Sequence, residues 1–300
     1  MRQKPGWALA LGVAAAGLVT LSTGTASAYC RTSSCNGEVA AVCTPAQPTD
    51  CGVPLFWPTR CVSFAVQTDA SSDVNAATTQ DVAAQAFATW AAAECPGGGN
   101  PNISAEDFGL VNCDQVEYDG ESKNANIIMY RDTAWPYDAS ALALTTVTFA
   151  TESGEIRDAD IELNSERADF TTSDANVDTD LLSILTHETG HFLGLAHSPD
   201  DSATMFADYP PKSTTLRSLE ADDIAAICEA YPPTSSRECD PEPRNGFATE
   251  CGVPADEGGG GCGCAIPSSG AQRSWSLAAL GLVAWFGRAA RARRSDRRRR

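Results

Sequence analysis

The sequence predicts one α+β domain, in which a twisted mixed β-sheet carries three main helices and the first two helices pack on the sheet. Two observations lead to this prediction. Several short segments alternate apolar and polar residues or are continuously apolar, as strands are, and two longer segments repeat apolar residues at helical spacing. The 300 residues, 43% of them hydrophobic, suffice for a domain of about 150–200 residues with extensions.

Four strands are expected between residues 61 and 163. Residues 61–66 alternate apolar and polar side chains and predict a half-buried strand. Residues 126–130 resemble a buried strand. Residues 141–149 and 156–163 predict two further strands, joined by the turn residues Glu152-Ser153-Gly154.

Three helices are expected. The first covers residues 73–94, with Ser72 or Asp73 as its cap and an apolar face, and Cys95-Pro96-Gly97 ends it. The second covers residues 178–193 and begins with acidic side chains, which favour the positive end of the helix dipole. The third covers about residues 219–231 and ends at Pro232-Pro233.

The ends of the chain predict further segments. Residues 1–28 resemble a secretory signal peptide: two basic residues, an apolar stretch and the cleavage pattern Ala26-Ser27-Ala28. Residues 29–53 form a cysteine-rich extension, 54–233 the main domain, 234–265 a linker rich in Pro, Gly and Cys, and 266–300 a tail with an apolar segment and an arginine cluster. An even number of cysteines in an exported chain predicts disulfides, whose pairing stays open.

The charge distribution is uneven. Without residues 1–28 and 266–300 the chain holds 10 basic and 38 acidic residues. Such an acidic body argues against a nucleic-acid partner, because phosphate would be repelled. It is equally consistent with cation binding or with an ordinary solvated surface.

All three histidines of the chain lie within eleven residues, in the run His187-Glu188-Thr189-Gly190-His191-Phe192-Leu193-Gly194-Leu195-Ala196-His197. His187 and His191 are four apart on a predicted helix, so both project from one face and can bind one zinc ion. Glu188 is displaced around the helix, where it can take a proton from a metal-bound water.

A third ligand requires the helix to stop. Gly194 allows the turn, because glycine tolerates positive φ, and His197 follows three residues later. Three protein ligands leave a fourth position open, which is typical of a catalytic zinc site. The alternative, a helix that carries the five-residue string by chance, loses weight because the glycine and the third histidine complete the pattern.

This motif, followed by Met205 in Ser202-Ala203-Thr204-Met205-Phe206, resembles the metzincin metalloproteases, and Ser198 after the third histidine resembles the matrixins among them. The resemblance covers roughly residues 54–232. It implies that His187, His191 and His197 bind one catalytic Zn²⁺, that Glu188 is the general base, and that Met205 lies beneath the metal. It also implies that residues 141–145 bind protein or peptide substrates as an added strand, although a plain core strand is an equal alternative.

Several features depart from the family. No histidine remains for a second zinc, and Tyr209 lies too far from Met205 to be assigned as a ligand. Asp158, Asp160, Asp174 and Asp178 are candidate Ca²⁺ ligands, although solvated loop acids are commoner. The string Cys-Gly-Val-Pro at Cys51 and Cys251 resembles a latency switch, which disulfide pairing would exclude.

The motif Cys262-Gly263-Cys264 and the tail at residues 266–300, with its short apolar helix and arginines, together resemble myxobacterial C-terminal sorting signals. We therefore expect a secreted, extracellular enzyme attached to the membrane or surface of a bacterial cell. The enzyme is expected to be a monomeric zinc metalloendopeptidase. The rivals are a surface-binding module with structural zinc and a processing protease for one partner protein.

Overall fold

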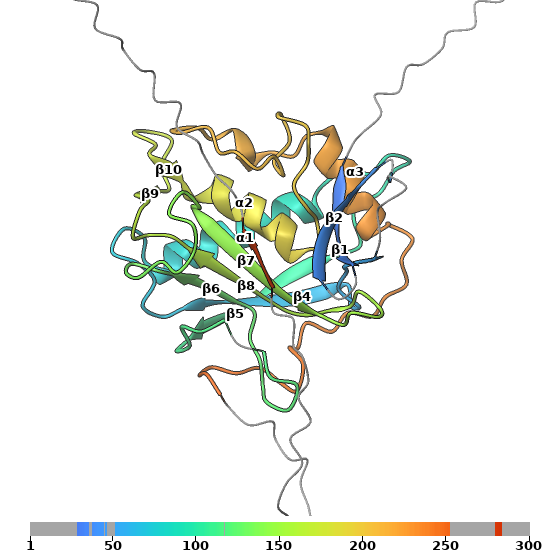
Figure 1. Ribbon diagram of the computed structural model, residues 1–300, viewed down its shortest axis with the longest axis horizontal. Helices are drawn as coiled ribbons and strands as arrows, with labels where there is room; N and C mark the ends of the chain where they lie inside the picture. Colours follow the sequence, from blue (N-terminus) through green and yellow to red (C-terminus); the bar gives the residue numbers. More distant parts are fainter. Residues whose placement is uncertain are drawn as a thin grey trace, which may run out of the picture.

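The computed structural model describes residues 29–35, 38–44, 46, 52–116, 118–252 and 280–283. The signal peptide, Cys51 and all of the tail except residues 280–283 lie outside this part of the chain. Within it, the expected α+β architecture is confirmed: a six-stranded mixed sheet carries two helices on one face (Figure 1).

The sheet has the strand order β11-β7-β8-β6-β4-β5. Strands β5, β4, β6 and β8 run parallel to one another, whereas β7 is antiparallel to β8 and β11 is antiparallel to β7. The bounds are β4 Cys61–Gln67, β5 Ser104–Val111, β6 Ile127–Tyr130, β7 Ala143–Phe149, β8 Ile156–Leu163 and β11 Leu280–Val283. The four strands expected from sequence are therefore present, and β5, which carries mostly polar or exposed residues, was missed.

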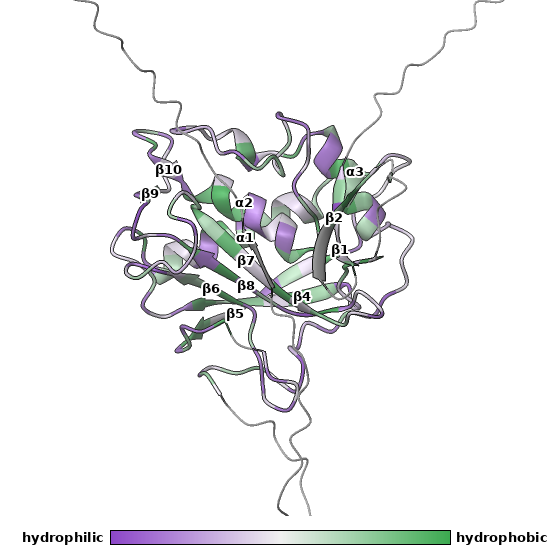
Figure 2. Ribbon diagram, in the orientation of Figure 1, coloured by the Kyte–Doolittle hydropathy of each residue, from purple (hydrophilic) through white to green (hydrophobic). Residues whose placement is uncertain are grey.

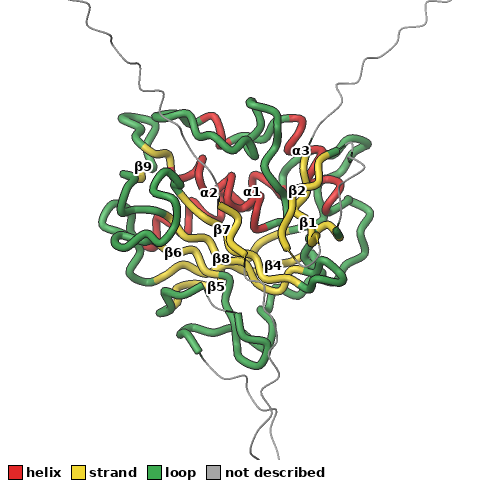
Figure 3. The backbone as a smooth tube through the Cα atoms, in the orientation of Figure 1, coloured by secondary structure: helices red, strands yellow, loops and turns green. Residues whose placement is uncertain are grey.

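Helix α1 (Ala76–Ala91) and helix α2 (Leu181–Phe192) pack against each other and against the same face of the sheet (Figure 3). Helix α3 (Ala221–Ala230) follows the 3-10 helix η1 (Thr215–Arg217). All three helices begin two to three residues later than expected. Asn75 caps α1, while the Ser71 hydroxyl closes a turn before it and so keeps Asp73 outside the helix.

The main core lies between the helices and the sheet. It includes the aromatic residues Phe64, Phe87, Trp90 and Phe192. The Phe87 ring stacks on Phe64 and meets Phe192 edge to face, and Trp90 is fully buried. In Figure 2 hydrophobic residues gather on the strands and on the helix faces, and the surrounding loops are more hydrophilic. This core fixes α2, the predicted motif helix, against β7 and β8.

Residues 29–53, expected as an extension, contribute to the fold. Strands β1 (Cys30–Cys35), β2 (Glu38–Cys43) and β3 (Val53–Pro54) form a small antiparallel sheet. Its strand β1 is largely buried and donates from Thr32 N to Gly194 O at 3.0 Å. The short strands β9 (Phe170–Thr171) and β10 (Thr179–Asp180) pair in parallel before α2.

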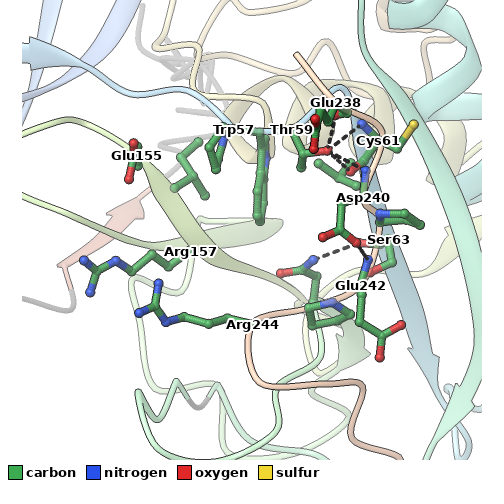
Figure 4. Close-up of a pocket in the computed structure, with 16 residues that line it drawn as sticks. Trp57, Thr59, Cys61, Ser63, Glu155, Arg157, Glu238, Asp240, Glu242 and Arg244 are labelled. Atoms are coloured by element: carbon green, nitrogen blue, oxygen red, sulfur yellow. Dashed lines mark hydrogen bonds between the residues drawn. The ribbon is translucent and has the colours of Figure 1, made fainter.

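Part of the segment expected as a linker lies along the sheet. Disulfides join Cys61 to Cys239 and Cys113 to Cys251, and two more join Cys30 to Cys43 and Cys95 to Cys228. Residues 238–244 and the sheet line a pocket of about 320 Å³, and Ser63, Asp240 and Glu242 are among the side chains that line it (Figure 4). None of the three histidines lines this pocket.

The apolar segment of the tail, which was expected to help attach the chain to a membrane or cell surface, lies mostly outside the described residues. No helix among the described residues is long and apolar enough to cross a bilayer. Residues 280–283, from the apolar segment of the tail, form strand β11 instead of a helix, because their backbone groups pair with β7 in the register Leu280 to Val147 and Val283 to Leu144.

Candidate metal centre and active site

Helix α2 begins at an anchored cap. The Asp180 carboxylate accepts a hydrogen bond from Ser183 N at 2.9 Å and so satisfies one free N–H group of the first turn. Arg217 holds both oxygens of the same carboxylate, at 2.8 Å from Nε and 2.5 Å from Nη2. All twelve residues of α2 are buried. The helix that carries the motif is therefore fixed at its start and along its length.

The three histidines converge. His187 Nε2 lies 3.1 Å from His191 Nε2, which lies 3.1 Å from His197 Nε2. Two nitrogen ligands of a tetrahedral zinc ion, each about 2.0–2.1 Å from the metal, lie about 3.3 Å apart. The nitrogen atoms therefore stand close to the spacing that one zinc ion requires, and the donor set fits this metal.

The opposite ring nitrogens fix the direction of two imidazoles. His187 Nδ1 lies 2.7 Å from Thr204 O, and His191 Nδ1 lies 2.9 Å from Leu195 O. A carbonyl oxygen can only accept, so each Nδ1 carries the proton and each Nε2 keeps its lone pair for a metal. One backbone carbonyl within the motif run, at Leu195, and one beyond it, at Thr204, thus orient the two imidazoles, and sequence reasoning did not identify them.

Burial keeps the imidazoles neutral. His187 and His191 are fully buried, and desolvation, followed by the neighbouring imidazoles, lowers the pKa of His187 well below its usual value and that of His191 to about 3. Burial lowers the pKa of His197 to about 4. Neutral imidazole is the form that binds metal, so the site is ready for a cation at neutral pH.

Glu188 is fully buried beside the centre. Its Oε2 accepts a hydrogen bond from the Thr145 hydroxyl at 2.6 Å, while its Oε1 has no hydrogen-bond partner among the described residues. Burial raises the pKa of Glu188 to about 8, and the Thr145 hydrogen bond acts in the opposite direction. A carboxyl group with a pKa in this range can both take and return a proton near neutral pH.

Two glycines shape this region. Gly194 has φ +88° just after α2, and a Cβ there would lie 2.6 Å from Leu55 O, so the turn that was expected at this position needs glycine. Gly190, on α2, leaves no room for a side chain, because a Cβ there would lie 2.2 Å from Met205 Sδ. Met205 therefore lies against α2 at Gly190, the residue before His191, and the segment that carries Met205 packs closely on this helix.

The turn that carries Met205 is held by a buried carboxylate. Asp223 accepts hydrogen bonds from Thr204 N at 2.7 Å and from Met205 N at 3.0 Å. Because Thr204 O in turn contacts His187, this carboxylate supports the first histidine from behind. Tyr209, which was not assigned as a ligand, places its hydroxyl 2.6 Å from Ser213 O.

The four aspartates that were candidate calcium ligands lie in different surroundings. Asp174 and Asp178 form ion pairs with Arg217 and Lys212, and Asp158 and Asp160 are buried in β8. Calcium binding therefore stays a prediction. Cys251 is bonded to Cys113, which confirms the disulfide expected there and excludes a latency switch at Cys251, because a disulfide sulfur cannot cap a metal as a thiolate.

Comparison with known proteins agrees with this geometry. Neutrophil collagenase from Homo sapiens is 34% identical over 84 residues, 25% of this chain and 18% of that protein. Matrix metalloproteinase-C from Caenorhabditis elegans is 38% identical over 109 residues, 34% and 18% respectively. Metalloendoproteinase 1-MMP from Arabidopsis thaliana is 38% identical over 66 residues, 22% and 18% respectively.

The aligned part of this chain thus spans about a fifth of the length of these relatives. A family model described as Matrixin matches residues 56–232, which is more than half of the chain and contains the whole histidine motif. The chain therefore belongs to the matrixin family of peptidases.

Proposed function

We propose that this chain is a zinc-dependent endopeptidase that hydrolyses peptide bonds of extracellular proteins. One observation carries the proposal: three neutral imidazoles present their Nε2 atoms to one point, beside a buried carboxylate with one unpartnered oxygen. His187, His191 and His197 would hold a zinc ion, which when bound would supply a Lewis acid for the substrate carbonyl and for a water molecule.

Glu188 supplies the proton transfers. Its Oε1 is the oxygen without a partner, so it can accept a proton from the attacking water while Oε2 stays bound to Thr145. The same oxygen then returns the proton to the leaving amine. The buried surroundings exclude bulk water from the carboxylate, which strengthens its hydrogen bonds.

Substrate is proposed to bind as an added strand. Strand β7 lies between β8 and the terminal strand β11, and α2 packs against β7 with Glu188 next to Thr145. The antiparallel pairing of β11 with β7 supports this mode, because in it the backbone of β7 pairs with an extended segment on the side away from β8. A peptide on this edge would pass in front of the residue that contacts Glu188.

Location and further ions form part of the proposal. Export through a signal peptide at residues 1–28 is supported by four described disulfides, which persist in oxidising compartments. Attachment to a bacterial cell surface through residues 266–300, a monomeric state and a calcium requirement are proposed from the sequence alone.

The deciding experiment is casein hydrolysis by the exported chain, with Glu188→Gln and with a chelator. We expect Glu188→Gln to retain one zinc ion per chain and to lose about 10²–10⁴-fold in rate, the contribution typical of a general acid–base group. The matched control, Glu152→Gln, changes an exposed glutamate and should leave the rate unaltered. Wild-type turnover by zinc-loaded Glu188→Gln would refute the mechanism.

A further inference from the structure

A buried hydroxyl faces the catalytic centre from the sheet. Thr145 lies in the middle of β7, between Ala143 and Val147, which point into the apolar core beneath α2. Thr145 itself is fully buried. Burying a hydroxyl in such a row is unfavourable unless it finds a hydrogen-bond partner. Packing alone therefore does not explain why a hydroxyl group occupies this position among apolar side chains.

The partner of this hydroxyl is the carboxylate of Glu188. Thr145 Oγ1 lies 2.6 Å from Glu188 Oε2 and 3.3 Å from Glu188 O. The carboxylate oxygens can only accept from a hydroxyl, so Thr145 donates. A distance of 2.6 Å is at the short end of the range for O–H···O hydrogen bonds. No other side chain in the described structure donates to either oxygen of this carboxylate.

We infer that Thr145 is a positioning residue for the proposed general base, because its hydroxyl fixes Oε2 of Glu188 and leaves Oε1 directed at the reacting water. The inference rests on the proposed function. A glutamate side chain has three rotatable bonds, and a carboxylate anchored at one oxygen keeps one orientation. Without the anchor, the carboxylate samples orientations in which neither oxygen reaches the water, and a misplacement of about 1 Å can cost about 100-fold in rate.

The kinetic test compares Thr145→Val with Thr145→Ser in the zinc-loaded full chain. Valine keeps the shape and suits a strand, whereas serine restores the hydroxyl. We expect Thr145→Val to lower kcat about 10- to 100-fold with KM changed less than about twofold, and Thr145→Ser to stay within about threefold of wild type. Thr148→Val, on the same strand and without a side-chain hydrogen bond in the described structure, is the matched control.

The second test does not depend on activity. Crystal structures of zinc-loaded wild type and Thr145→Val would display the orientation of the Glu188 carboxylate. We expect one orientation in wild type and several, or a rotated one, in Thr145→Val. An unchanged single orientation, or a wild-type kcat, in Thr145→Val would overturn the inference, as would a serine variant as slow as the valine variant. If wild type cleaves nothing, the proposed function fails, and the carboxylate orientation still decides the role of Thr145.

Discussion

Replacing Gly194 by alanine tests the turn that delivers the third histidine. Gly194 follows α2 with φ +88°, and an added Cβ would lie 2.6 Å from Leu55 O, a backbone atom that cannot swing aside. The positive φ costs a residue with a Cβ about 1–2 kcal/mol. The contact adds about 1–3 kcal/mol, which is typical of overpacking. We expect the free energy of unfolding to fall by about 3 kcal/mol in total.

The control separates these two contributions. Gly98 has nearly the same backbone angle, φ +96°, but a Cβ there would meet nothing within 4 Å. Gly98→Ala should therefore lose only the cost of the positive φ. For a domain of this size each kcal/mol lowers Tm by about 2–4 °C, so Gly194→Ala should melt about 6–12 °C below wild type.

The assay is thermal unfolding of both variants with disulfides intact, followed by titration with zinc. Because Gly194 lies between His191 and His197, strain at this turn should also weaken zinc binding, whereas Gly98→Ala should bind zinc as wild type does. Equal losses of stability in the two variants would refute the reasoning, because the Leu55 contact would then contribute nothing.

Three further predictions follow from the packing. Gly190→Ala should lose about 1 kcal/mol in urea unfolding, since its clash with Met205 outweighs the helix preference of alanine; a stabilised variant would contradict this. Deleting residues 266–300 removes β11 from the edge of β7, so KM for a peptide should fall, and an unchanged KM would argue against binding at this edge. Burial raises the pKa of Asp158 to about 8, so the folded state binds more protons than the unfolded state above pH 4 and loses stability as pH rises to 8. Asp158→Asn should therefore be more stable than wild type at pH 8 and similar at pH 4, and the reverse order in urea unfolding would refute the assignment.

The motif could be found from sequence because its geometry is local. His187 and His191 meet through the repeat of one helix, and a single glycine brings His197 back within eleven residues. The same reason applies to the strands β4, β6, β7 and β8, because an alternating or continuous apolar pattern is visible within a few consecutive residues. Strand β5 was missed because it lies at the sheet edge and carries exposed side chains, which leaves no apolar pattern to detect.

The parts that support the motif are set by distant segments, and sequence patterns do not record them. Thr145 is 43 residues from Glu188, and it reads as an ordinary strand residue until the fold places β7 under α2. Likewise Asp223 acts on His187 only through Thr204, which belongs to a different turn. Ligands chosen by local spacing can bind a metal, but their orientation depends on these long-range contacts. The contribution of the fold to catalysis is therefore best measured at Thr145 and Asp223, where a substitution leaves every residue of the motif in place.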